Sequence, residues 1–187
     1  MTTGDCFILT GSNKEEPMTL YQIDSVRGDK MDALSILVKK SQIMGWDIPK
    51  EYDNDIPEEA IELPRDTYSN VKHQMEEFVK QSYELIRKNL VEGDFEIEIG
   101  KRYVDWDVYT ISRLEDQRAY YDLFRIDTEN ISPCWSGSMN TDDIKEMRPV
   151  TEELYQELLC RYKSFVAKLQ DFLFSLAENQ SHSTCND

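Results

Sequence analysis

The chain has 187 residues, of which 40% are hydrophobic and 11% aromatic, and it carries 37 Asp and Glu against 21 Lys and Arg. A chain of this length builds a hydrophobic core without metal or disulfide, and its apolar content excludes a disordered protein. The formal net charge of −16 repels phosphate backbones and anionic membranes, so we expect a basic protein partner and no direct binding to nucleic acid or membrane.

The sequence also bears on the compartment. Residues 1–6 lack the basic and apolar regions of a signal peptide, and no apolar run approaches the roughly 20 residues of a membrane-spanning helix. The four cysteines lie far apart and form no CxxC pair, so reduced thiols are expected. These features predict a cytoplasmic protein.

The first elements are predicted as two strands and a helix. Apolar residues within 5–10 and 18–24, separated by a segment rich in turn formers, predict two strands. Residues 29–44 then carry apolar side chains at helical spacing, and Gly45 follows as a stop. We therefore expect a first helix over residues 29–44.

An acidic connection follows over residues 46–64. It contains three prolines and, between Asp47 and Glu62, seven acids against one lysine, which predicts a surface loop extended by charge repulsion. Asp53 and Asp55 superficially resemble the start of a calcium loop, but the required glycine and closing glutamate are absent. The two aspartates are therefore candidates for contact with a basic partner.

A long helix and a β meander are predicted next. Residues 66–91 repeat apolar side chains at helical spacing. Apolar and acidic residues then alternate from Phe95 to Ile99, and Gly100 begins a two-residue turn that suits a hairpin. We expect a three-stranded antiparallel meander over residues 94–127.

The register of that hairpin sets Glu96 opposite Asp105 on the polar face, with Asp107 one step along. Like charges directly opposite each other destabilise a sheet, so a cation or a basic partner would offset them. Such a cluster could hold a divalent metal or a carboxylate with a raised pKa. The simpler explanation is solvated side chains on an exposed face, screened by water and salt.

The C-terminal part is predicted to be irregular and then helical. In the irregular segment 128–149, Trp135 either covers the edge of the core or anchors a partner. Thr151 caps a final helix over 151–178, whose apolar stripe packs on its own sheet and also permits a homodimer. We expect residues 179–187 to be a disordered tail.

Together these elements predict an α+β fold: one domain over residues 1–178, with a mainly antiparallel sheet of about five strands and three main helices on one face. We see no internal repeat. No nucleophile, phosphate-loop or zinc-protease motif occurs, and neither a cofactor nor a metal is predicted.

The resulting hypothesis is a non-enzymatic acidic interaction module of the inhibitor, immunity or charge-mimic type. The alternative is a small ligand-binding or metal-assisted enzyme domain that uses carboxylates on the polar sheet face. The candidate binding residues are Glu96, Asp105, Asp107, Trp135, Asp53 and Asp55.

Overall fold

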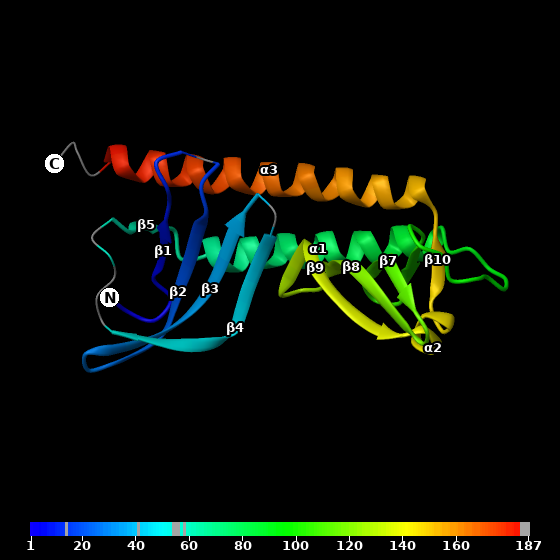
Figure 1. Cartoon of the computed structure of the whole chain (residues 1–187). Helices are drawn as coiled ribbons and strands as arrows, with labels where there is room; N and C mark the ends of the chain where they lie inside the picture. The colour runs from blue at the N-terminus through cyan, green and yellow to red at the C-terminus, as the bar shows by residue number, and fades with distance from the viewer. Residues whose placement is uncertain (14, 41, 54–56, 58, 184–187) are drawn as a thin grey trace. The chain divides into compact units, whose positions relative to one another are not determined.

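The computed structural model describes residues 1–13, 15–40, 42–53, 57 and 59–183. Within them the chain is α+β, with ten strands and three helices instead of the predicted five strands. It divides into two compact units, the first formed by Met1–Met75 with Lys163–Asp187 and the second by Glu76–Tyr162. Figure 1 shows the elements of both units along the chain. That residues 1–178 form one domain stays a prediction.

The first unit contains five antiparallel strands in the order β4–β3–β2–β1–β5. The predicted strands at 5–10 and 18–24 are confirmed as β1 and β2. Tyr68 of helix α1 (Thr67–Lys88) lies against Cys6, and Lys72 pairs with Asp47 at 2.9 Å. The strands are β1 (Cys6–Leu9), β2 (Met18–Arg27), β3 (Lys30–Lys39), β4 (Gln42–Asp53) and β5 (Ile61–Leu63).

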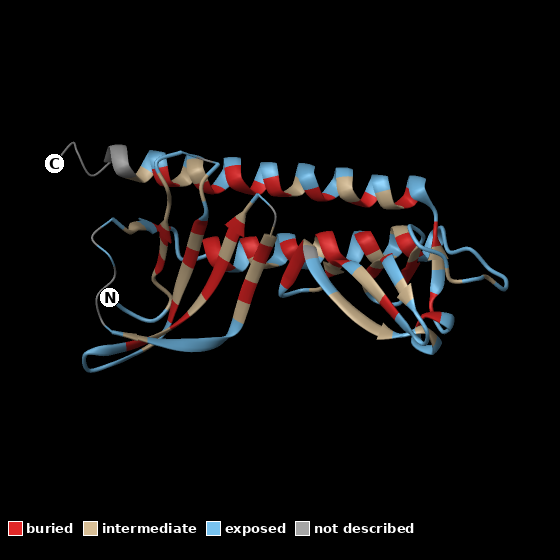
Figure 2. Ribbon diagram, viewed as in Figure 1, coloured by how far each residue is buried: buried red, intermediate tan, exposed pale blue. Residues whose placement is uncertain are grey.

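The helix predicted over 29–44 is wrong, because these residues form β3 and the start of β4. Strand β3 buries side chains on both faces, so its apolar residues do not alternate strictly (Figure 2). A short apolar run of this kind cannot be distinguished from a helix by periodicity alone.

The loop predicted over 46–64 is also wrong in its first half, which belongs to β4. Ser35 pairs with Trp46 and Ala33 with Lys50, so the register shifts between these pairs. Pro49 falls within that shift and has no partner in β3. A proline is tolerated there because the ladder does not need its missing N–H group.

The second unit contains five more antiparallel strands, in the order β10–β6–β7–β8–β9. The strand predicted from Arg118 is confirmed as β8, whereas the irregular segment predicted over 128–149 is wrong. The strands of this unit and the short helix α2 are, in chain order, β6 (Arg102–Val104), β7 (Val108–Glu115), β8 (Arg118–Ile126), β9 (Asn130–Asn140), α2 (Thr141–Lys145) and β10 (Arg148–Val150).

The predicted hairpin between Phe95 and Trp106 does not form. Strand β6 pairs with β7 on one side and with β10 on the other, so it has no free edge for the segment before it. That segment instead lies against Tyr103, whose ring stacks on Phe95 at 5.1 Å. The Tyr103 hydroxyl donates to the Glu96 carbonyl and accepts from the Glu98 N–H, both at 3.0 Å.

The two long predicted helices are confirmed as α1 and α3 (Glu152–Ser183). Thr151 caps α3, since its Oγ1 accepts a hydrogen bond from the Leu154 N–H at 3.3 Å. In the second unit α3 packs on the sheet through ring contacts of Tyr155 and Tyr162 with Phe124. Helix α3 runs beyond the predicted limit of 178, and residues 184–187 lie outside the described part of the chain.

The order of elements occurs twice, which the sequence did not reveal. Strands β1–β4 form a meander, β5 returns to pair with β1, and α1 follows; strands β6–β9, β10 and α3 repeat this order. All seven residue pairs between β7 and β8 have counterparts between β2 and β3, numbered 88 lower. Ile23 thus pairs with Ala33 as Ile111 pairs with Tyr121, and a register shift follows each pair.

Candidate functional site

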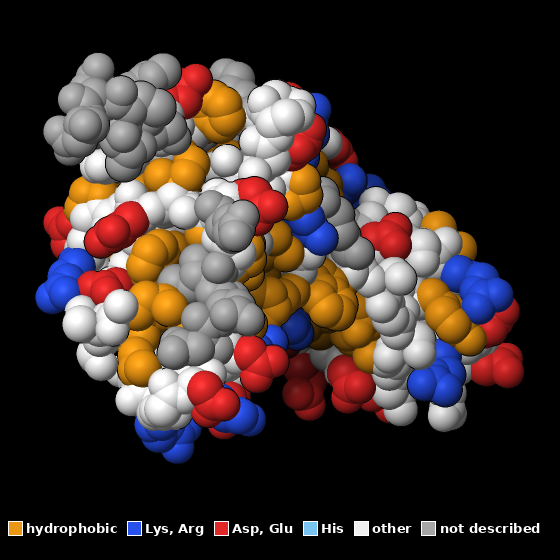
Figure 3. Space-filling model, turned by 90° about the vertical axis from the view of Figure 1, so that its left-hand side faces the viewer, with side chains coloured by type: hydrophobic (Ala, Val, Ile, Leu, Met, Phe, Trp, Pro, Cys, Tyr) orange, Lys and Arg blue, Asp and Glu red, His pale blue; other side chains and the backbone are white. Residues whose placement is uncertain are grey.

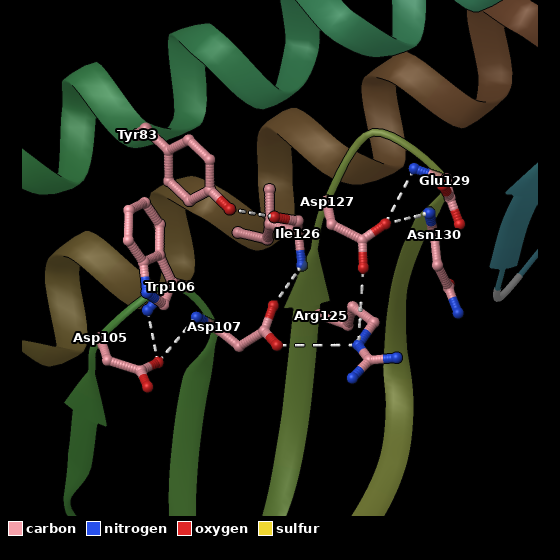
Figure 4. A network of polar contacts seen from close by, with 9 residues as sticks. All are labelled: Tyr83, Asp105, Trp106, Asp107, Arg125, Ile126, Asp127, Glu129 and Asn130. Carbon is pink, nitrogen blue, oxygen red and sulfur yellow. Dashed lines mark hydrogen bonds and ion pairs between the residues drawn. The ribbon is translucent and has the colours of Figure 1, made fainter.

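The turn between β6 and β7 consists of Asp105, Trp106 and Asp107. The Asp105 Oδ1 accepts hydrogen bonds from the backbone N–H groups of Trp106 and Asp107, the latter at 3.1 Å (Figure 4). An aspartate that binds the N–H groups following it replaces backbone pairing and fixes the turn. The turn presents the Trp106 ring to solvent, with 67% of the residue exposed.

Asp107 points from this turn toward the sheet, and its side chain is only 14% exposed. It accepts a hydrogen bond from the Ile126 N–H at 2.8 Å, and its other oxygen lies 3.6 Å from Arg125 Nε. Burial raises the pKa of Asp107, while the Ile126 N–H and the Arg125 charge act in the opposite direction. The carboxylate therefore holds the turn against the end of β8.

Arg125 connects this carboxylate to the next turn. Its Nε lies 3.7 Å from Asp127 Oδ2, and its guanidinium lies 5.7 Å from the centre of the Trp135 ring. Asp127 also accepts from the N–H groups of Glu129 and Asn130 (Figure 4). Two turns, each fixed by an aspartate, are thus joined by a single arginine.

Tyr83 of α1 supports Trp106 from one side. Its hydroxyl donates to the Ile126 carbonyl at 2.6 Å, and its ring meets the indole edge-on at 6.1 Å. Burial and the nearby carboxylates of Asp107 and Asp127 raise the pKa of Tyr83 to about 12, so the hydroxyl stays a hydrogen-bond donor. Beside these rings is a hollow of about 290 Å³ lined by Tyr83, Ile86, Arg87, Leu90, Val104, Asp105, Trp106, Glu146 and Arg148.

The structure brings together part of the predicted site. Asp105 and Asp107 lie in one turn, and Trp135 approaches it through Arg125. The predicted position of Glu96 opposite Asp105 is wrong: Glu96 is exposed and lies beside Tyr103, in a segment that does not pair with β6.

The remaining predicted residues belong to the other unit. Asp53 ends β4 in the first unit and is exposed, while Asp55 lies outside the described residues. Sequence reasoning missed Trp106, Tyr83, Arg125 and Asp127. Only the predicted strand over 118–127 placed Arg125 and Asp127 near a turn, and nothing in the sequence joined Tyr83 to them.

Three comparisons with known proteins add no assignment: neither a family model, nor a curated protein, nor a solved structure matches this chain. Among residues 1–183, apart from the few positions left undescribed, no group of three His, Cys, Asp or Glu side chains could hold a metal ion. None of the helices in the described part of the chain is long and apolar enough to cross a bilayer.

Proposed function

We propose that the chain is a non-enzymatic interaction module that binds a basic protein partner through the turn at Asp105–Asp107. The observation that carries this proposal is Trp106, a largely exposed indole on a turn that is fixed by hydrogen bonds, next to the exposed Asp105. Tryptophan is enriched among the residues that contribute most to binding energy at protein interfaces.

The chemistry of this turn favours a partner with Lys or Arg side chains. A cation can lie over the Trp106 ring while it pairs with Asp105, whose side chain is on the exposed part of the turn. The hydrogen bonds of the turn order its backbone before binding, which lowers the conformational entropy lost in the complex. The net charge of −16 accelerates the approach of a basic protein and makes association sensitive to salt.

The enzyme alternative has one observation in its favour, the raised pKa of Asp107. That carboxylate, however, already accepts the Ile126 N–H and faces Arg125. These contacts suit a structural role in holding the turn better than a role in proton transfer, so the interaction module remains our proposal.

The experiment is affinity capture from native cell lysate at low salt, with elution by a salt gradient. We expect to capture a basic protein that wild type retains and Trp106→Ala does not. Trp135→Ala is the control and should retain it, because the Trp135 indole is less exposed, at 42%, and lies against Arg125. In purified form, this protein should bind Trp106→Ala at least tenfold more weakly than it binds wild type. A tenfold change corresponds to about 1.4 kcal/mol of binding free energy lost with the indole contact.

Equal binding of the purified protein to wild type and Trp106→Ala would contradict the proposal. So would the absence of any protein whose retention depends on salt.

A further inference from the structure

Two arginines beside Trp106 differ from all the other arginines of the chain. Each of the others forms an ion pair or a side-chain hydrogen bond. The side chains of Arg87 and Arg148 form neither with any described residue. Both are exposed, and both line the hollow of about 290 Å³ beside the Trp106 ring.

This lack of partners is unusual in a protein with a net charge of −16. On the face that Figure 3 shows, the Lys and Arg side chains lie close to Asp and Glu side chains. A guanidinium without such a neighbour is available to an external anion, and its planar fork suits a carboxylate or a phosphate. The two arginines therefore mark the hollow as a site for an anionic group.

The hollow also has an apolar lining. Ile86, in the last turn of α1, and Val104, at the end of β6, are both buried, while Leu90 is exposed. Arg148 of β10 pairs with Val104. All the residues that line the hollow belong to the second unit, and they and their neighbours in the chain are described. An occupant thus meets apolar side chains as well as arginines.

The charges that line the hollow favour an anion with a single charge. Asp105 and Glu146 balance Arg87 and Arg148, and within the described residues neither acid forms an ion pair with either arginine. A phosphate group carries a charge of about −1.5 to −2 at pH 7, so the two acids repel it more than they repel a carboxylate. A carboxylate is therefore the better match.

The combination of arginines and apolar side chains favours the end of a chain over an internal acidic residue. An internal Asp or Glu uses its side chain for the carboxylate and has no second side chain for the apolar lining. A C-terminal residue carries its carboxylate and an apolar side chain on the same Cα. It can therefore meet the arginines and the apolar lining at the same time, as in other sites that capture a chain terminus.

We propose that the hollow binds the C-terminal residue of the basic partner, with the terminal carboxylate at Arg87 and Arg148. The last side chain is apolar and packs on Ile86 and Val104, beside the Trp106 ring. Lys or Arg residues that precede it meet Asp105. This inference rests on the function proposed for the turn at Trp106 and adds which part of the partner is recognised there.

The probe is a synthetic peptide of sequence Gly-Lys-Gly-Lys-Gly-Leu with a fluorophore at its N-terminus and an unmodified C-terminal carboxylate. One control peptide has a C-terminal amide, and another ends in Ser in place of Leu. Fluorescence anisotropy at about 0.05 M NaCl, where exposed charges are weakly screened, measures their affinity for the full chain. We expect saturable binding of the probe and at least tenfold weaker binding of each control peptide.

Two variants locate the carboxylate. Arg87→Gln and Arg148→Gln should each weaken binding of the probe at least tenfold and leave binding of the amidated peptide unchanged. Lys88→Gln is the matched control, because Lys88 is exposed, lies in the same last turn of α1 and does not line the hollow. It removes the same charge and should bind the probe as wild type does. Circular dichroism checks the fold of each variant.

Equal binding of the probe and the amidated peptide would overturn the inference. If Trp106→Ala weakened both peptides alike, the proposed function of the turn would nevertheless stand. Undiminished binding of the probe to both arginine variants, or no binding at up to about 1 mM, where the free energy of binding is only about −4 kcal/mol, would also overturn the inference.

A further peptide, amidated and with Asp in place of the last Gly, tests an internal acid. Binding as tight as that of the probe would assign the arginines to an acidic side chain and overturn the inference. If the probe binds as expected but no basic protein is captured from lysate, the hollow recognises chain ends and the function proposed for the turn fails.

Discussion

Asp107 holds the turn of the candidate site, and its burial sets a dependence of stability on pH. Because burial raises its pKa in the folded state, the protonated form is favoured by folding. Its contribution to stability is therefore present below the pKa of the unfolded chain and is lost as pH rises through the folded-state pKa. Asp107→Asn, which still offers an oxygen to the Ile126 N–H, lacks this titration.

We expect the free energy of unfolding of wild type, relative to Asp107→Asn, to fall as pH rises from about 3 through the folded-state pKa of Asp107. Urea unfolding of both proteins across this range measures the difference. Asp122→Asn, which changes an exposed carboxylate of the same unit, is the control. A difference that rises with pH would show that the Arg125 pair outweighs burial.

Among the contacts between neighbouring strands, Gly137 of β9 pairs with Tyr121 of β8. A Cβ at this position would lie 2.7 Å from Tyr121 Oη, closer than such atoms approach each other. We expect Gly137→Ala to lower the free energy of unfolding by about 1–3 kcal/mol, because the Tyr121 ring must move. Adding Tyr121→Phe removes the nearest atom and should recover part of the loss.

Urea unfolding of the two single variants and the double variant measures this coupling. Ser136→Ala, one residue away and exposed, is the matched control. If Gly137→Ala unfolded at the same urea concentration as wild type, the ring would have room that the structure does not show.

Elements with one buried stripe were predictable from the sequence, and elements buried on both faces were not. The apolar periodicity of α1 and α3 predicted both helices correctly. Strand β3 has apolar residues on both faces, so its sequence pattern resembles that of a helix. Pro49 and Pro133 suggested loops, yet both lie at register shifts within strands. The site was predicted in part, since Asp105 and Asp107 are close in sequence while Tyr83, Arg125 and Asp127 meet them only through tertiary structure.

The repeat of the element order appears only at the scale of the whole molecule. The two long helices bury residues at matching positions, 87 residues apart in the chain. The buried residues of α1 are Val71, Met75, Val79 and Ile86, and their counterparts in α3 are Leu158, Tyr162, Val166 and Leu173. Few of these paired residues are identical, because packing requires only apolar side chains of suitable volume. The repeat is therefore recognised from the strand registers and the pattern of buried residues, and not from sequence identity between the two halves.

The net charge of −16 belongs to the molecule as a whole, and it opposes folding by self-repulsion. We expect the melting temperature at pH 7 to rise by about 3 °C between about 0.01 M and about 0.3 M NaCl, because salt screens the repulsion. A shift of this size corresponds to a gain of about 1 kcal/mol in the free energy of unfolding for a chain of this length. Calorimetry measures the shift, and the same titration near the isoelectric point is the control. A melting temperature at pH 7 that salt leaves unchanged would contradict a net repulsive field.

The most direct test of the proposed function is the affinity of the captured basic partner at two salt concentrations. Titration calorimetry of wild type should show the Kd rising at least tenfold from about 0.05 M to about 0.5 M NaCl, because salt screens exposed charges. Asp105→Asn should bind more weakly at low salt and depend less on salt. If salt and Asp105→Asn both leave the Kd unchanged, binding is not directed by the carboxylates of this turn.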